Sequence, residues 1–266
     1  MVIFQLVQLG YRSKSWTLNR KINIAFIGDS HIEQSISDEA QYSILKFAQS
    51  GDNYIYTYTK LQKLLNDNPS IDTVVLGIDF HNIDKTSEEW YTSQSYINFK
   101  FPKLYPYMKA KEVRKLVGFY PWGYCKAISN LFSIQDLITD DDFVKVYGSY
   151  QISSDTISKD SLLVKPKHNY KEVPSATQFE YLGKIRELCQ SKGVKLIFLT
   201  CPIHSNTYKS GVLDGLITGY AKQYQIQYLN LREMAMEDNY FADKFHINRA
   251  GSKYFTEQLL KLLRKN

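Results

Sequence analysis

A serine at the end of an expected strand has the position that a nucleophilic catalyst needs. Ser30 closes the triplet Gly28-Asp29-Ser30, which follows the apolar run 22–27. This position puts the hydroxyl at the carboxyl edge of the expected sheet, where α/β folds bind ligands, and beside the N–H groups of a helix start. By itself the triplet is also typical of an ordinary turn in which serine caps a helix.

A second block, Asp243-Lys-Phe-His246, lies near the other end of the chain and supplies the groups that a serine nucleophile needs. Histidine is the usual general base near neutral pH, and it requires a partner that fixes its tautomer. Residues three apart in a helical turn or tight loop face the same side, so Asp243 is expected to hold His246. The alternative is a solvated carboxylate beside a half-buried histidine.

The two blocks together resemble the SGNH (GDSL-like) hydrolase family. In that family a Gly-Asp-Ser block follows the first strand, and an Asp-x-x-His block precedes the last helix. Here His246 is followed by Ile-Asn-Arg-Ala-Gly251 and an expected final helix. The resemblance implies an esterase or acetylhydrolase in which Ser30 is the nucleophile, His246 the base and Asp243 its partner.

The resemblance also implies where an oxyanion is held. The family uses the N–H of the nucleophile, a glycine from a second block and an asparagine from a third. Ser30 fits the first of these. Gly51, in the run Phe-Ala-Gln-Ser-Gly51-Asp-Asn, fits the second. We therefore expect the backbone N–H groups of Ser30 and Gly51 to face the reacting carbonyl.

The third block departs from the family pattern. It falls on Gly-Ile-Asp79-Phe, with Asp79 where asparagine is expected. An ionised carboxylate accepts hydrogen bonds and donates none, so Asp79 would repel a developing oxyanion. Asn82, three residues further on, is the expected substitute donor, and Asn53 is a more distant one.

Other polar residues follow expected strands and are candidates for the pocket: Asp29, His31, His81 and His204. His31 comes directly after the nucleophile and is read either as a pocket residue or as a solvent-facing residue of the first helical turn. No two of these histidines have the spacing of a metal site. We expect neither a metal nor a cofactor.

The order of the elements predicts a doubly wound, flavodoxin-like α/β fold with a parallel sheet of about five strands. Residues 1–266 are read as one domain, in which residues 88–175 break the rhythm and form an insertion capping the active edge. Expected strands are 22–27, 73–78, 194–200 and 226–231; expected helices are 30 to about 48, 58–66, 176–191, 213–223 and from about 250 onward.

The insertion combines aromatic and basic residues. Between Tyr96 and Tyr124 nine aromatic residues alternate with Lys and Arg, a composition suited to a lid that holds an acidic glycan. The alternative is a cap packed on its own aromatics with a solvated basic rim. No recognised nucleic-acid motif accompanies the patch, so nucleic acid is not an expected partner.

Bulk composition indicates an ordinary globular protein, with 44% hydrophobic and 23% charged residues and a net charge of +6. The three cysteines are widely spaced and suggest no disulfide framework. Residues 2–9 are apolar but too short to span a bilayer, and are read as a strand, a surface segment or the end of a truncated anchor. We expect a soluble chain without a membrane span or signal peptide, in the cytoplasm, or in the cell envelope if an anchor is truncated.

These observations predict a serine esterase that removes small acyl groups, O-acetyl above all, from a carbohydrate or another small ester. Two alternatives remain open. One is an O-acyltransferase that uses the same three residues on a surface polysaccharide. The other is a non-catalytic glycan-binding protein with a degraded site, which the unexpected Asp79 favours.

Overall fold

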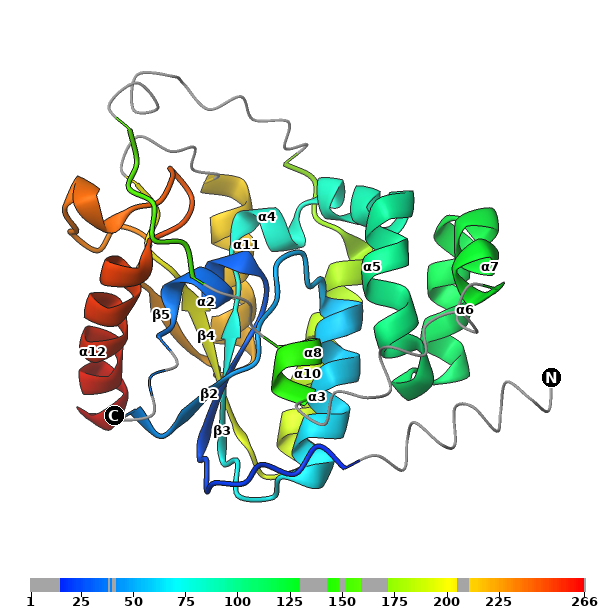
Figure 1. The fold of residues 1–266 in the computed structure, drawn as a ribbon, viewed down its shortest axis with the longest axis horizontal. Helices are drawn as coiled ribbons and strands as arrows, with labels where there is room; N and C mark the ends of the chain where they lie inside the picture. Colours follow the sequence, from blue (N-terminus) through cyan, green and yellow to red (C-terminus); the bar gives the residue numbers. More distant parts are fainter. Residues whose placement is uncertain are drawn as a thin grey trace.

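A five-stranded, all-parallel sheet forms the centre of the protein in the computed structural model (Figure 1). The structure describes residues 15–37, 39, 42–129, 143–148, 152–158, 172–204 and 211–265. The strand order is β2-β1-β3-β4-β5, which confirms the expected doubly wound fold of about five strands. The strands are β1 (Ile24–Ile27), β2 (Ile44–Lys46), β3 (Thr73–Gly77), β4 (Lys195–Thr200) and β5 (Gln227–Asn230).

Helices cover both faces of the sheet, and shorter helical turns lie at its edges. The α-helices are α2 (Ser30–Ser35), α3 (Tyr54–Asp67), α4 (Phe80–Ile83), α5 (Gln94–Leu104), α6 (Ala110–Phe119), α7 (Pro121–Ser129), α8 (Phe143–Tyr147), α10 (Ala176–Ser191), α11 (Gly211–Gln223) and α12 (Arg249–Lys265). Three 3-10 segments are η2 (Lys85–Tyr91), η3 (Tyr105–Tyr107) and η6 (Asp238–Tyr240). None of the described helices is long and apolar enough to cross a membrane.

The sheet is buried on both sides because successive strand residues enter different cores. In β3, Val74 and Leu76 pack with α3, α10 and α11, whereas Val75 packs with α2 and α12. All three side chains are fully buried. Continuous β-branched and aliphatic runs of this kind are what a parallel sheet between two helical layers requires.

The segment after Ser30 differs from the sequence expectation of one helix reaching about Ala48. Helix α2 ends at Ser35, and Ile44–Lys46 forms the edge strand β2, paired in parallel with β1. Ile44 and Leu45 point into opposite cores, as successive strand residues do. The sequence expectation of a helix rested on the roughly helical spacing of Ile32, Ile36, Ile44 and Phe47, which concealed the strand. The apolar run 2–9 lies outside the described residues.

The described parts of segment 88–175 pack mainly beside α3 (Figure 1). Helix α5 contacts α3, η2 and α7. Helix α6 contacts α7, and its Glu112 and Lys115 bond to side chains of α10. Many aromatic residues of segment 88–175 are buried, as Phe101 on α5 and Tyr124 on α7 are, whereas Trp122 on α7 is 74% exposed. Some of the aromatic residues of this segment therefore pack between the helices of the segment itself.

Candidate active site

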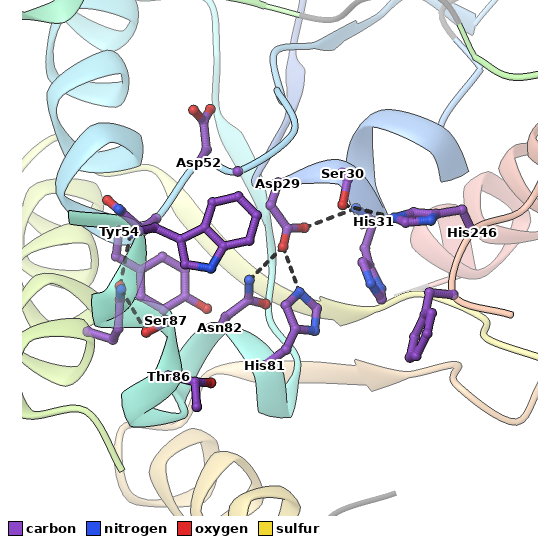
Figure 2. Close-up of a pocket in the computed structure, with 15 residues that line it drawn as sticks. Asp29, Ser30, His31, Asp52, Tyr54, His81, Asn82, Thr86, Ser87 and His246 are labelled. Atoms are coloured by element: carbon purple, nitrogen blue, oxygen red, sulfur yellow. Dashed lines mark hydrogen bonds and ion pairs between the residues drawn. The ribbon is translucent and has the colours of Figure 1, made fainter. Parts of the chain in front are cut away.

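Ser30, His246 and Asp243 form a continuous chain of contacts at the carboxyl edge of the sheet, and Figure 2 shows the Ser30–His246 part of it. Nε2 of His246 lies 2.9 Å from Oγ of Ser30. On the other side of the ring, Nδ1 lies 2.9 Å from Oδ2 of Asp243. His246 and Asp243 follow Ser30 in the chain by 216 and 213 positions. The structure nevertheless places the three side chains in the geometry of a nucleophile, a base and an orienting carboxylate.

Local packing holds Ser30 at the tip of β1. Asp29 caps α2, and its Oδ1 accepts the N–H of His31 at 3.0 Å. Gly28 has a φ of +155°, and a Cβ there would lie 2.9 Å from the Ile32 side chain. A Cβ on Gly77 would lie 2.4 Å from the same side chain. The two glycines therefore let the first turn of α2 pack directly onto the ends of β1 and β3.

A tight turn presents His246. Oδ1 of Asp243 accepts the backbone N–H groups of Phe245 at 2.7 Å and His246 at 2.9 Å, which closes the turn on the carboxylate. The Asp243 side chain is 55% exposed and His246 is 26% exposed. Burial raises the pKa of Asp243, but the hydrogen bond and charge of His246 outweigh it and leave that pKa below its ordinary value. Asp243 therefore stays ionised beside the ring.

Backbone donors beside Ser30 are available for an oxyanion. In the described part of the chain, no hydrogen bond uses the N–H of Ser30 or of Gly51, and both residues line the same pocket. Gly51 has a φ of +75°, and a Cβ there would lie 2.3 Å from the hydroxyl of Tyr96 on α5. Only glycine combines this backbone conformation with the close approach of Tyr96.

Two asparagines line the pocket, and their amide groups differ in what they bond. Asn82 donates from Nδ2 to Oδ2 of Asp29 at 2.7 Å and accepts the N–H of Asp79 at 2.8 Å. Asn53 caps α3 through Oδ1, and its buried Nδ2 has no partner among the described residues. Asn53 therefore has a free donor at the pocket wall, whereas Asn82 is engaged in supporting Asp29.

Asp29 is held by a pair of donors from the turn after β3. Nε2 of His81 lies 2.6 Å from Oδ2 of Asp29. Burial raises the pKa of Asp29, but the charge and hydrogen bond of His81 outweigh it and hold that pKa well below its usual range. Burial lowers the pKa of His81, but the charge and hydrogen bond of Asp29 outweigh it and leave that pKa above its usual value. The pKa of His31, in contrast, is held well below its usual value by burial and by the charge of His81. His31 is thus neutral at physiological pH.

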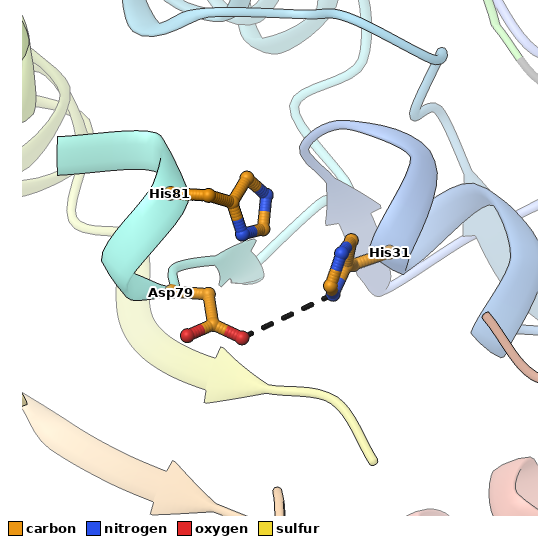
Figure 3. A group of neighbouring side chains, drawn as sticks. All are labelled: His31, Asp79 and His81. Atoms are coloured by element: carbon orange, nitrogen blue, oxygen red, sulfur yellow. Dashed lines mark ion pairs between the residues drawn. The ribbon is translucent and has the colours of Figure 1, made fainter. Parts of the chain in front are cut away.

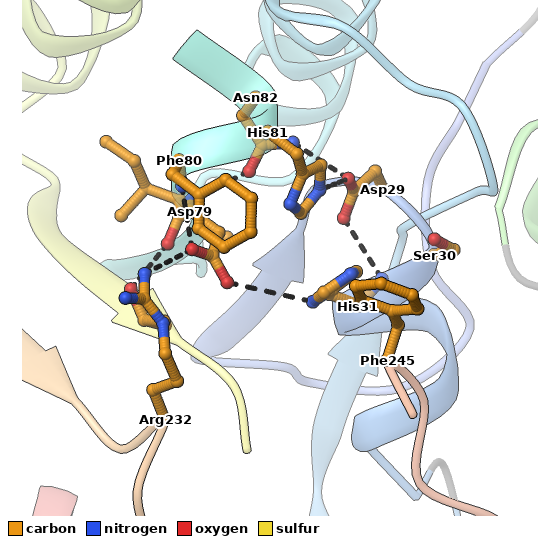
Figure 4. A network of polar contacts seen from close by, with 12 residues as sticks. Asp29, Ser30, His31, Asp79, Phe80, His81, Asn82, Arg232 and Phe245 are labelled. Carbon is orange, nitrogen blue, oxygen red and sulfur yellow. Dashed lines mark hydrogen bonds and ion pairs between the residues drawn. The ribbon is translucent and has the colours of Figure 1, made fainter. Parts of the chain in front are cut away.

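Asp79 does not line the pocket beside Ser30. Its Oδ1 is bound by the guanidinium of Arg232, which also forms a 2.6 Å hydrogen bond to Asp214, and its Oδ2 faces His31 (Figures 3 and 4). Burial raises the pKa of Asp79, and the charge of Arg232 offsets part of that effect. The repulsion of an oxyanion expected from Asp79 is therefore not supported by its position. Arg232 follows β5 by two residues, which was the available signal for its place at this edge.

The pocket has a volume of about 290 Å³. His31, His81 and Asp29 lie in its wall. His204 lies at a separate cavity with Arg232, where its Nε2 is 3.0 Å from Oδ1 of Asp238. Residues not foreseen in the pocket wall are Asp52, Tyr54, Thr86, Ser87, Trp90, Gln178 and Phe245. They come from helix starts, turns and α10, where no local pattern distinguishes a pocket residue.

A buried ionic cluster supports the loop that carries Gly51. Asp52 accepts from Lys60 at 2.6 Å and from Lys100 at 2.7 Å, and all three side chains are almost completely buried. Lys100 also donates to Gln49 at 2.7 Å. Burial lowers the pKa of Lys100 to about 8, although Asp52 acts in the opposite direction. Since Lys100 belongs to α5, segment 88–175 contributes directly to the position of this loop.

No family model and no curated protein matches the sequence. Several solved structures can be aligned with this chain over nearly its whole length. A Bacteroides fragilis protein named as a candidate acylhydrolase aligns at 11% identity and a TM-score of 0.46, over 98% of this chain and 95% of its own. A Bacteroides thetaiotaomicron GDSL-like lipase aligns at 11% identity and a TM-score of 0.45, over 98% and 96%.

A third structure, from Streptococcus pneumonia and named as a candidate platelet activating factor, aligns at 13% identity and a TM-score of 0.47, over 98% of this chain and 94% of its own. At these identities and TM-scores the likeness assigns no activity. The chemistry has to come from the side chains of this chain.

Proposed function

We propose that the chain is a serine ester hydrolase that removes small acyl groups, O-acetyl in the first place, from a carbohydrate. The observation that carries the proposal is the unbroken contact chain from Ser30 through His246 to Asp243, which opens into a pocket of about 290 Å³. Pockets for small molecules have volumes of about 300–1,000 Å³, so this one suits a short acyl group.

The proposed reaction starts with attack of Ser30 Oγ on the ester carbonyl carbon while His246 Nε2 takes the hydroxyl proton. Asp243 accepts a hydrogen bond from Nδ1–H and stabilises the imidazolium. The tetrahedral intermediate collapses when its C–O bond to the alcohol breaks and His246 returns the proton to that alcohol. Water then attacks the carbonyl carbon of the acyl-serine while His246 takes a proton from the water. The bond to Ser30 Oγ breaks, His246 returns the proton to Oγ, and the carboxylic acid leaves.

The oxyanion is held in this proposal by the N–H groups of Ser30 and Gly51 and by the amide of Asn53. Each is a donor that lines the pocket and has no acceptor among the described residues. Removing one such donor from an oxyanion hole costs about 10²–10³-fold in kcat. Asn82 acts one step further out, by fixing Asp29.

Trp90 supports the carbohydrate part of the proposal. It lies on η2 in the pocket wall, yet 49% of its surface is exposed. An indole face half open to solvent is suited to stack on a sugar ring outside the pocket while the acyl group enters it. The non-catalytic alternative rested on Asp79, which does not line the pocket.

Hydrolysis of an acetylated oligosaccharide, compared with 4-nitrophenyl acetate, tests both parts of this proposal. We expect the wild type to release acetate from both, and Trp90→Ala to raise KM for the sugar ester much more than for 4-nitrophenyl acetate. Trp122→Ala, which removes an exposed tryptophan on α7, is the matched control and should change neither value. Turnover of neither ester would end the hydrolase proposal; turnover of 4-nitrophenyl acetate alone would end its carbohydrate part.

A further inference from the structure

Three side chains beside the Ser30 pocket form a group that ester hydrolysis does not use. His31 lies in α2, which follows β1, while Asp79 and His81 come from the turn after the neighbouring strand β3. One donor atom from each lies within 4.8 Å of the others, and Figure 3 shows the three side chains converging. The geometry points to a binding site for a divalent transition-metal cation, Zn²⁺ in the first place, formed by His31, Asp79 and His81.

Two of these donor atoms are buried and unsatisfied. Nδ1 of His31 and Oδ2 of Asp79 have no hydrogen-bond partner among the described residues, and the two side chains are 10% and 3% exposed. They face each other at 3.9 Å, too far for a hydrogen bond. Leaving a buried polar atom unpaired costs about 1–3 kcal/mol. A cation between them would satisfy both atoms at once.

The spacing suits a cation after a small adjustment. Zinc binds histidine nitrogen and carboxylate oxygen at about 2.0–2.1 Å in tetrahedral geometry, which places two ligand atoms about 3.3 Å apart. The His31–Asp79 gap closes to this value with a shift of about half an ångström. The donor of His81, which lies within 4.8 Å of the other two, has to move closer by up to about 1.5 Å to reach the same spacing.

Neighbouring groups orient two of the three proposed ligands, His81 and Asp79. Nε2 of His81 is taken by Asp29 at 2.6 Å, which leaves Nδ1 as its free nitrogen. Arg232 binds Oδ1 of Asp79 and leaves Oδ2 turned toward His31 (Figure 4). A carboxylate on the far nitrogen of a ligating histidine is the usual outer support of a metal site.

The charges at this edge also favour a divalent cation. Asp29, Asp79 and Asp214 bring three carboxylates, and Arg232 is the guanidinium paired with two of them. A protonated His81 would offset one of the two excess negative charges. A divalent cation would offset both.

The donor set itself indicates the class of metal. Two imidazoles and one carboxylate suit Zn²⁺ and related transition metals, whereas Mg²⁺ and Ca²⁺ prefer oxygen ligands. Three protein ligands leave a fourth position for water or an oxygen of a bound ligand. His31 and His81 both line the Ser30 pocket, so that position lies close to the proposed substrate.

Calorimetric titration of tag-free, EDTA-dialysed protein with Zn²⁺ tests the site without using activity as the readout. We expect one equivalent to bind, and bound Co²⁺ to give the intense visible absorption of a tetrahedral site. His31→Ala and His81→Ala should each abolish stoichiometric binding. Asp29→Asn, which removes the carboxylate that supports His81 but keeps an oxygen for the N–H of His31, should weaken it about 10–100-fold.

Two variants control for other histidines. His204→Ala removes a buried histidine from a different cavity, and His246→Ala removes the one beside Ser30. Both should keep one equivalent of Zn²⁺. No saturable binding by the wild type, binding unchanged in His31→Ala and His81→Ala, or binding lost in His246→Ala would each overturn the site. Because the readout is metal binding, failure of the site leaves the ester hydrolase proposal standing.

Discussion

Replacing Ser30 with alanine is expected to lower kcat for ester hydrolysis by about 10³–10⁶-fold. The variant loses the oxygen that forms the acyl intermediate, while the pocket and the donors of Ser30 N–H and Gly51 N–H remain. Only the residual effect of binding and oxyanion stabilisation should persist. Steady-state kinetics with 4-nitrophenyl acetate measure the loss, at enzyme concentrations high enough to detect the residual activity.

Ser129→Ala, at the exposed end of α7, is the matched control and should retain wild-type kinetics. The unfolding free energy of Ser30→Ala should change by only about 1 kcal/mol, because the side chain makes one hydrogen bond, to His246. Retention of more than about a tenth of wild-type kcat by a folded Ser30→Ala protein would contradict the proposed role, since a lost nucleophile costs far more.

Asp52→Asn is expected to produce the largest loss of stability, about 3–5 kcal/mol. The carboxylate is the shared partner of Lys60 and Lys100, which are both buried. Neutralising it removes the carboxylate that the two buried ammonium groups share as a hydrogen-bonded partner. Urea or thermal unfolding, with the free energy of unfolding compared at one pH, measures the effect.

The double variant Asp52→Asn, Lys100→Met should regain part of that stability, because it removes one of the two stranded charges. Glu39→Gln is the surface control: it breaks the exposed Glu39–Lys253 pair, at 3.3 Å, and should cost less than about 1 kcal/mol. Equal effects of Asp52→Asn and Glu39→Gln would show that the buried cluster does not stabilise the loop.

Features carried by short stretches of sequence could be predicted, and features made by distant partners could not. The position of Ser30 after a strand and the spacing of Asp243 and His246 are local, and the structure brings these residues together. Strand β2 was missed because its apolar residues also fitted a helical period. Spacing alone cannot tell an edge strand of three residues from the end of a helix.

The environment of Asp79 shows the limit most clearly. In the sequence, Asp79 occupies the place where the family pattern has an asparagine that donates to the oxyanion. The negative charge of Asp79 therefore argued against catalysis. Its partner Arg232 lies 153 residues further along the chain, and only the strand order β3-β4-β5 in the sheet brings the two together. The same holds for Lys100 and Asp52, which no local pattern connects.

Labelling by a fluorophosphonate probe is the most direct test of the proposed serine chemistry. The reagent phosphonylates an activated serine, and peptide mass spectrometry locates the adduct. We expect one adduct per chain, on Ser30, that is lost in His246→Ala because the base no longer takes the hydroxyl proton. An unlabelled wild type, or an adduct on another serine, would contradict the proposal that Ser30 is the nucleophile of an ester hydrolase.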